Sequence, residues 1–406
     1  MTPSDYRARI ARLNTRLNAF VDLSDEMSGA GLAWGVKSNI AVCGLPCTAG
    51  IAAYRDNIAA NDAEVVRRIR ASGGDVLGTV NMHEGALGAT TDNAAYGRTQ
   101  NPWRLGFTPG GSSGGSGAAV AAGLCDVALG SDTMGSVRIP AAYCGVQGHK
   151  PTTGLVPNEG VLALSNTLDH VGPIARDVRT LWRALHVIAG WGEPAELAPI
   201  ELQGLRIGVW DGAGKVEMTS SVRRGFDAAI VALRDAGVRI TNLEPPAYDY
   251  GKARRAGLLI SEVEGAAIHA EQLETNPDEF SEAFRGLMAW GVAQSSSKIT
   301  AAYEHVAEIR NAAPKVFDAV DVVVAPTAPQ QAFSFDDPAP ADQADFTAWA
   351  NFAALPATAV FTGFSGDGLP LSLQIIGPTG EDKLMLRCAT AMESIFGAPQ
   401  LPPEFA

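Results

Sequence analysis

The sequence contains little of what would support a metal site, a disulfide framework or a nucleic-acid surface. It has five cysteines and six histidines in 406 residues, and neither residue type shows the spacing of metal ligands. Lysine and arginine number 31 against 44 aspartates and glutamates, for a net charge of −13, and the basic residues form no cluster. Because a nucleic-acid groove needs clustered positive charge, we expect no nucleic-acid partner. We also expect no metal and no organic cofactor.

Long apolar runs are missing as well. No uncharged apolar stretch reaches the roughly 18 residues of a membrane span. Residues 1–7 contain no apolar core of a secretory signal. The odd number of cysteines is typical of reduced and mostly buried thiols, here Cys43, Cys47, Cys125, Cys144 and Cys388. Together these absences predict a cytoplasmic protein without a membrane segment.

The sequence has enough hydrophobic residues to form a large folded core. Hydrophobic residues make up 46% and charged residues 18% of the chain, which is typical of a globular protein. The 44 glycines favour tight turns and close backbone packing. No internal repeat or linker divides the chain. We therefore expect one domain over residues 1–406, with a catalytic core at about 30–180 and a C-terminal half, about 200–396, that shapes the substrate site.

The hydrophobic patterns predict an α/β fold. Residues 32–40 and 75–80 read as strands, and the apolar spacing between 62 and 70 predicts a helix between them. A strand–helix–strand unit of this kind favours a parallel or mixed sheet with helices packed on it. Further strands are expected at 127–129, 205–210, 238–243, 322–325, 357–362 and 371–376, helices at 5–20, 116–123, 251–272, 279–312 and 381–396, and a long surface loop at 326–345.

A loop rich in glycine and serine, residues 110–117, is the first candidate for chemistry. Glycines around Ser112 and Ser113 allow backbone conformations that are closed to other residues. A flexible linker, a phosphate-binding loop and a nucleophile elbow are the alternatives. A phosphate loop requires a lysine after its glycines, and an elbow requires a strand before its serine. Neither is present, since alanine follows the loop and residues 101–109 are rich in turn signals.

A second serine and a buried-strand lysine complete the candidate site. Ser136 follows a strand and a tight turn, so the backbone N–H groups of Thr133, Met134, Gly135 and Ser136 can converge on a developing oxyanion. Lys37 shares one strand face with small residues. Burial there would lower its pKa towards that of a neutral, proton-accepting amine. A lysine that reaches solvent from the strand end is the alternative.

These segments, taken in order, resemble the amidase signature hydrolases from about residue 8 to residue 396. The 24-residue interval between the two serines (136 − 112 = 24) is similar to that of the family and selects Ser112 over Ser113. The resemblance rests on the lysine strand 36–40, the glycine–serine segment 110–123, the nucleophile loop 131–141, the following segment 145–154 and the C-terminal run 368–377.

The resemblance implies a fold and a mechanism. The fold would be a single domain with a large twisted mixed β-sheet between layers of α-helices. The mechanism would use a Ser–Ser–Lys triad, with Ser136 as nucleophile, Ser112 as bridging serine and Lys37 as base. A cis peptide bond before Ser112 is also implied. Where the family usually has Gly-Gly before the nucleophile, this chain has Met134-Gly135, so we expect Met134 and, by the same resemblance, Ala86 to border the acyl pocket.

The function expected from this resemblance is hydrolysis of a small-molecule carboxylic amide to an acid and ammonia or an amine. The catalytic component of a tRNA-dependent glutamine amidotransferase shares the triad and is the main alternative, although the short chain and acidic balance favour a stand-alone amidase. An esterase or carbamate hydrolase would form the same acyl-enzyme. A non-catalytic binding protein on this fold is disfavoured, because all three triad positions are intact. A homodimer is among the expected assemblies.

Overall fold

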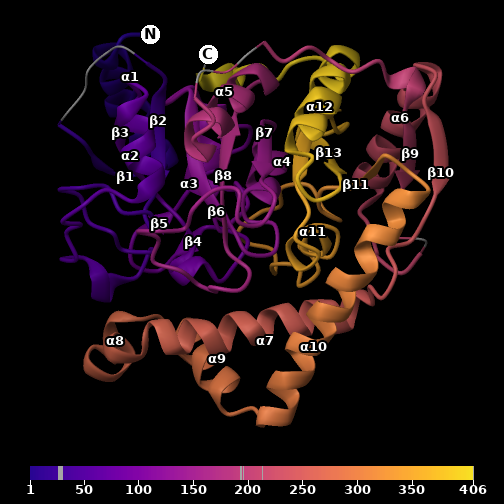
Figure 1. Ribbon diagram of the computed structural model, residues 1–406. Coiled ribbons are helices and arrows are strands. Elements are labelled where there is room, and N and C mark those ends of the chain that lie inside the picture. The colour runs from indigo at the N-terminus through magenta and orange to yellow at the C-terminus, as the bar shows by residue number, and fades with distance from the viewer. Residues whose placement is uncertain (26–30, 193, 195, 213, 406) are drawn as a thin grey trace.

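The structure is a computed structural model that describes residues 1–25, 31–192, 194, 196–212 and 214–405. Its centre is a sheet that, within these residues, has 11 strands in the order β1-β3-β2-β6-β8-β7-β12-β13-β11-β9-β10 (Figure 1). These strands are β1 (Phe20–Leu23), β2 (Ala33–Lys37), β3 (Asp75–Val80), β6 (Val127–Asp132), β7 (Gln147–Lys150), β8 (His170–Ala175), β9 (Arg206–Val209), β10 (Arg239–Asn242), β11 (Val322–Pro326), β12 (Ala357–Phe364) and β13 (Pro370–Ile376). A separate two-stranded sheet pairs β4 (Asp92–Asn93) with β5 (Gly97–Arg98).

The sheet is mixed and runs through both halves of the chain. Strand β2 pairs in parallel with β3 and β6, and β9 pairs in parallel with β10 and β11. The antiparallel pair β7–β12 joins the strands of the first half to those of the second. The predicted mixed sheet is confirmed, and its two halves share one hydrogen-bonded layer.

Helices cover both faces of the sheet. Side chains of β2 alternate between the two faces, with Trp34 and Val36 in one apolar cluster and Ala33 in another. The first cluster is closed by α2 (Glu64–Ala71), α5 (Val178–Ala189), α6 (Ser220–Asp235) and α12 (Asp382–Phe396). The opposite face is closed by α1 (Pro3–Leu17), α3 (Gly114–Ala121), α4 (Arg138–Cys144), α7 (Tyr250–Ile268), α10 (Ser296–Ala312) and α11 (Ala348–Phe352).

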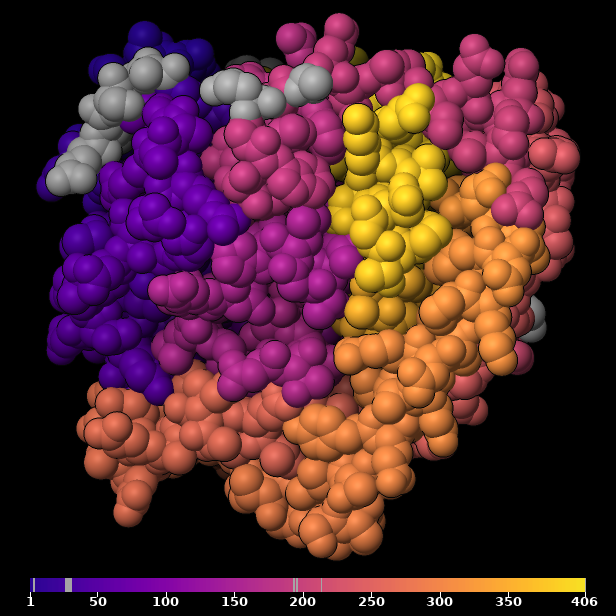
Figure 2. All heavy atoms as spheres, viewed as in Figure 1, coloured from indigo at the N-terminus to yellow at the C-terminus, as the bar shows by residue number. Residues whose placement is uncertain are grey.

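Helix α7 runs beneath the sheet layer in the view of Figure 1, with α8 (Ala270–Thr275), α9 (Glu282–Val292) and α10 beside it. The space-filling view shows these helices as the lower margin of the same face, in contact with the first half of the chain (Figure 2). The C-terminal half therefore brings a helical wall up to the strands of the N-terminal half.

The expected elements agree with the structure over much of the chain, with several differences. The expected helix 279–312 is interrupted, because Ser295 caps a new helix with its side chain. Several elements were not predicted: strands β1, β4, β5, β7 and β8 and helices α5 and α11. Helix α4 was also missed, since Pro140 in its sequence argues for a turn, although proline is tolerated in the first turn of a helix.

Two further observations bear on the expected class. Cys43 is exposed and the other four cysteines are buried, and all five are free thiols, as predicted. Among the helices of the described ranges, none has both the length and the apolar character that a membrane crossing needs.

Candidate active site

Three parallel strands converge on one edge of the sheet. Strand β2 ends at Lys37 and lies between β3, which ends at Val80, and β6, which ends at Asp132. The carboxyl ends of neighbouring parallel strands meet at the same edge, where ligands bind in open α/β sheets. The segments that follow β3 and β6 carry His83 and Ser136 to this edge, beside the end of Lys37's own strand.

Lys37 is completely buried in a hydroxyl environment. Its Nζ donates hydrogen bonds to Ser112 Oγ at 2.7 Å and to Ser131 Oγ at 2.8 Å. Burial lowers the pKa of Lys37 to about 7, against the opposing fields of Asp169 and Asp132. A substantial fraction of the amine is then neutral near pH 7, and a neutral amine can accept a proton from a neighbouring hydroxyl.

The two adjacent serines of the glycine-rich loop point to different partners. The peptide bond between Gly111 and Ser112 is cis, as the family resemblance implied. Ser112 Oγ contacts Lys37, whereas Ser113 Oγ donates to the carbonyl of Ser131 at 3.3 Å on strand β6. The contact with Lys37 supports the choice of Ser112 that the serine interval suggested.

Ser136 occupies the open side of this arrangement. Ser136 is partly exposed and lines a cavity, while Ser112 and Lys37 have no solvent exposure. Its carbonyl accepts the N–H of Ser113 at 3.3 Å, which fixes the two loops against each other. Within the described residues, no hydrogen bond joins the hydroxyls of Ser112 and Ser136. Catalytic hydrogen bonds often shorten only when substrate is bound.

The turn before Ser136 has a glycine where a side chain would not fit. Gly135 has a φ of +139°, and a Cβ there would lie 2.2 Å from Thr347 Oγ1. Met134 has no positive φ, and its carbonyl accepts the Thr347 hydroxyl at 2.6 Å. In the described part of the chain, the N–H groups of Met134, Gly135 and Ser136 donate no hydrogen bond. They are therefore available to a ligand oxygen, as an oxyanion site requires.

A buried ion pair that the sequence reasoning missed brackets the same turn. Arg138 Nε and Nη2 each lie 3.0 Å from a carboxylate oxygen of Asp132, and both side chains have no solvent exposure. Burial alone would raise the pKa of Asp132, but Arg138 holds it below its usual range. Arg138 Nη1 also donates to the carbonyl of Thr347 at 2.9 Å. The sequence did offer a signal for this ion pair, because Asp132 and Arg138 place opposite charges at the two ends of a short loop between apolar segments.

Thr133, the first residue of the turn, is fixed by another buried carboxylate. Its hydroxyl donates to Asp169 Oδ1 at 2.6 Å, and Asp169 Oδ2 accepts the N–H groups of Leu164 and Ser165. Burial raises the pKa of Asp169 despite these bonds. The sequence reasoning singled out neither Asp169 nor Ser131, because each acts through contacts with distant segments.

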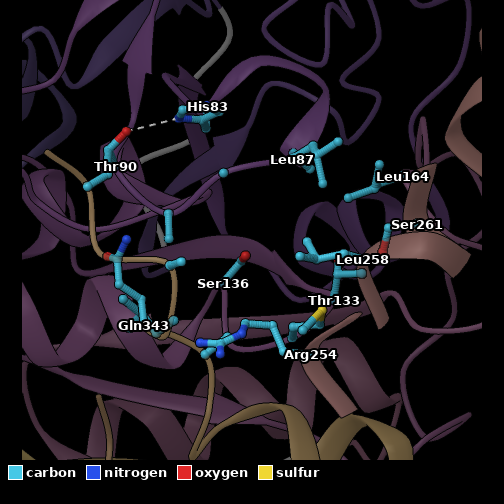
Figure 3. A pocket seen from close by; sticks show the side chains of 18 of the residues that line it. His83, Leu87, Thr90, Thr133, Ser136, Leu164, Arg254, Leu258, Ser261 and Gln343 are labelled. Carbon is cyan, nitrogen blue, oxygen red and sulfur yellow. Dashed lines mark hydrogen bonds between the residues drawn. The ribbon is translucent and has the colours of Figure 1, made fainter. Parts of the chain in front are cut away.

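The cavity beside Ser136 has a volume of about 350 Å³ and a mostly apolar wall. Figure 3 shows Ser136 near the middle of the view, with Gln343 to its left, Arg254 below it, and Leu258 and Leu164 to its right. Ala86 and Met134, expected near an acyl group, both line it, and the second half of the predicted 326–345 loop closes it. The lining residues are His83, Ala86, Leu87, Gly88, Ala89, Thr90, Thr133, Met134, Ser136, Ile139, Leu164, Arg254, Leu258, Ser261, Ala339, Pro340, Ala341, Gln343 and Ala344.

The three histidines near this edge of the sheet have different environments. His149 is a satisfied structural residue, as predicted, with Thr358 Oγ1 and Asp382 Oδ1 at 2.8 and 3.1 Å from its two ring nitrogens. His83 lines the cavity and contacts Thr90 Oγ1 at 3.2 Å (Figure 3).

Burial lowers the pKa of His83 to about 4 and that of His170 to about 3, so both rings are neutral near pH 7. No cluster of three or more His, Cys, Asp or Glu side chains suited to a metal ion occurs in the ranges that the structure describes.

A family model described as Amidase matches residues 6–386. The chain belongs to the amidase signature family. A glutamyl-tRNA(Gln) amidotransferase subunit of Exiguobacterium sibiricum is 35% identical over 451 aligned residues, covering 97% of this chain and 93% of that protein. A crystal structure of an amidase superposes with a TM-score of 0.89 at 28% identity, covering 98% of this chain and 97% of the other. The peptide amidase of Stenotrophomonas maltophilia gives a TM-score of 0.84 at 26% identity, covering 98% and 94%.

These similarities confirm the family resemblance and the fold class. Membership also makes this chain an enzyme that acts on carbon–nitrogen bonds.

Proposed function

We propose that the enzyme hydrolyses a small carboxylic amide through an acyl-enzyme on Ser136. The observation that carries the proposal is the contact between the buried Lys37 amine and Ser112, in a loop whose next residue, Ser113, donates its N–H to the carbonyl of the partly exposed Ser136. A lysine with a pKa near 7 in this position can act as a base without a histidine. Because the residues that the proposed triad requires are present at positions 37, 112 and 136, a purely binding function is disfavoured.

The proposed reaction begins with proton transfer through the two serines. Ser136 Oγ attacks the amide carbon and passes its proton to Ser112 Oγ, which passes its own proton to Lys37 Nζ. The developing oxyanion accepts hydrogen bonds from main-chain N–H groups of the Thr133–Ser136 turn. The C–N bond then breaks as the relay returns a proton to the leaving nitrogen.

The second half of the reaction reverses these roles. Ser136 is now an ester of the acyl group, and a water molecule attacks its carbonyl while the relay removes the water proton. Collapse releases the carboxylic acid and returns the proton to Ser136. Esters and carbamates would follow the same route. The difference among these substrates is the leaving group.

The catalytic component of a tRNA-dependent glutamine amidotransferase is the second candidate. Its basis is the 35% identity to such a component over nearly the whole of both chains. The same triad would release ammonia from glutamine in a larger assembly. We favour the stand-alone amidase because the chain carries a net charge of −13, which does not suit a tRNA surface.

The two halves of the chain have separate tasks in this proposal. The segment of about 30–180 supplies the triad and the turn, and the segment of about 200–396 shapes the substrate site through α7 and the 339–344 loop. We place the enzyme in the cytoplasm and include a homodimer among its expected assemblies.

An ammonia-release assay on the isolated chain, combined with gel filtration, tests the proposal. The panel contains aliphatic and aromatic amides, glutamine, and matched esters and carbamates, and Ser136→Ala is the control. Turnover of simple amides by the isolated protein is the expected result. Turnover of glutamine alone, and only after the other components of an amidotransferase are added, would instead support the amidotransferase function. Equal turnover by Ser136→Ala would overturn both.

A further inference from the structure

We propose that the natural substrate carries a carboxylate on its acyl group and that the Arg254 guanidinium binds this carboxylate. The inference rests on the proposed function, because it names the substrate class of the same site. It follows from the charge distribution of the cavity wall, from the hydrogen-bonding groups of Arg254 that remain free, and from the position of Arg254 relative to Ser136.

The cavity wall contains one permanent charge. Among the described residues that line it, Arg254 is the only lysine or arginine, and none is an aspartate or glutamate. His83 is the other titratable cation and is neutral near pH 7. The remaining wall is apolar or carries uncharged groups such as Gln343 and Ser261. A cation on an otherwise uncharged wall favours an anionic ligand.

Arg254 has donors to spare. Its Nη1 lies 3.2 and 3.3 Å from the two carboxylate oxygens of Asp345, and in the described part of the chain its Nε and Nη2 donate no hydrogen bond. The Arg254 side chain remains 26% exposed, whereas that of Asp345 is 5% exposed and does not line the cavity. A guanidinium with free N–H groups on one side can bind a carboxylate through two parallel hydrogen bonds.

The position of Arg254 suits the far end of a short acyl chain. It projects from α7, and Arg254 and Ser136 both line the cavity, with the Arg254 guanidinium below Ser136 in the view of Figure 3. Met134, on the turn before Ser136, lines the cavity, and its Sδ packs against Gly257 of α7. It therefore contributes apolar surface between α7 and the cavity. A molecule with an amide at one end and a carboxylate at the other can therefore contact both groups within a cavity of about 350 Å³.

A structural tie is the competing explanation for Arg254. Through Asp345 it joins α7 to the loop of residues 339–344 that closes the cavity. A tie and a carboxylate site predict different responses. Loss of a tie would affect neutral and anionic substrates alike, whether Arg254 or Asp345 were changed. Loss of a carboxylate site would affect anionic substrates selectively and only when Arg254 is changed.

The experiment compares kcat/KM for two matched series at constant pH and ionic strength. One contains the monoamides of malonic, succinic, glutaric and adipic acids, and the other contains propionamide, butyramide, valeramide and hexanamide. The wild type is expected to prefer one of the anionic monoamides over its neutral partner. In Arg254→Gln this preference is expected to fall about 30-fold, the range for hydrogen bonds to a charged group.

Two further variants make the result specific. Asp345→Asn is expected to keep or increase the preference, since it removes the competing carboxylate. Arg255→Gln changes an exposed arginine on the same helix and is expected to leave the preference unchanged. Equal losses for both substrate series in Arg254→Gln and Asp345→Asn would reduce Arg254 to a tie and overturn the proposal.

A binding measurement separates this inference from the proposed function. Titration calorimetry with Ser136→Ala compares glutarate and valerate, with and without Arg254→Gln. Glutarate is expected to bind more tightly, and Arg254→Gln is expected to remove the difference. Equal binding of the two acids would contradict carboxylate recognition even if amides are hydrolysed. Glutarate binding without any amide turnover would contradict the proposed function and leave the recognition site standing.

Discussion

Lys37 and Lys150 have the same burial and the same shift of pKa but different neighbours. Both side chains are completely buried at the end of a strand, and burial lowers the pKa of each to about 7. Lys37 Nζ donates to two serine hydroxyls. One of them belongs to Ser112, whose carbonyl accepts the N–H of the cavity-lining His83. Lys150 Nζ donates to the carbonyl of Pro151 at 2.8 Å.

The difference shows that a depressed pKa is not enough to make a base. A carbonyl oxygen has no proton to give, so Lys150 can take none from its partner. A hydroxyl partner can both give and receive a proton, so the proposed proton relay can include Lys37 but not Lys150. The positive charge of Arg138 also contributes to the low pKa of Lys150, whereas burial is the one lowering cause for Lys37.

The largest expected effect comes from replacing each lysine by methionine. Lys37→Met is expected to lose about 10³-fold or more in kcat, in the range of general-base catalysis. Lys150→Met, an apolar replacement in a buried site, is expected to stay within about tenfold of wild type, since it removes no group of the relay. Steady-state kinetics and circular dichroism on both variants make the comparison. Similar losses in two folded variants would remove the distinction drawn between the lysines.

The pH dependence sharpens the same comparison. Protonated Lys37 cannot accept a proton, so kcat/KM is expected to rise with pH through about 7, the pKa of Lys37, and then level off. Below that pKa the active fraction falls about tenfold per pH unit. Both lysines titrate near the same pH, so the wild-type profile alone does not identify the group. The rise of kcat/KM with pH should persist in Lys150→Met. If the rise disappears in that variant, the titrating group is Lys150 and not Lys37.

A substitution at Met134 should change the selectivity for the acyl group without removing a residue of the proposed proton relay. Met134 lines the cavity, and its backbone does not need a glycine. Met134→Gly is expected to widen the pocket and improve longer acyl groups relative to shorter ones, by about 1–3 kcal/mol per methylene. The measurement is kcat/KM across amides of increasing acyl length, with Met134→Leu as a control of similar bulk. Parallel length profiles for Met134→Gly and wild type would show that Met134 only packs against α7.

The smallest effects are expected from the histidines of the two regions. His83 lies on the Lys37 side, and His149 and His170 lie on the Lys150 side, on β7 and β8. Because the proposed relay uses two serines and a lysine, replacing each histidine in turn by glutamine should leave a folded enzyme with measurable turnover. Kinetics and thermal melts on the three variants test this. A natively folded but inactive His83→Gln enzyme would place a histidine in the mechanism.

The sequence was sufficient for features that depend on local patterns. Strand 75–80 was predicted with its observed bounds. The family resemblance, through its serine interval, implied Ser112, which the structure brings to Lys37. Contacts between distant segments were not predictable in this way. Arg138 donates a hydrogen bond to Asn351 on α11, which is 213 residues away in the sequence. The hydrophobic pattern of neither segment predicts that contact.

The wall of the cavity was predictable only in part. The loop 326–345 was expected near the active site because long irregular loops in compact enzymes often are, and its residues 339–344 line the cavity. Arg254 could not be selected, because α7 carries three basic residues within its first turns and only the packing of the helix decides which one lines the cavity.

The central claim is that Ser136 becomes the covalent nucleophile under the control of Lys37. The most direct measurement is labelling with a fluorophosphonate probe, followed by mass spectrometry of the modified peptide. The account predicts a single adduct on Ser136, absent in Ser136→Ala, much slower in Lys37→Met and formed at a near wild-type rate in Lys150→Met. An adduct on another residue, or labelling of Ser136→Ala at the wild-type rate, would contradict it.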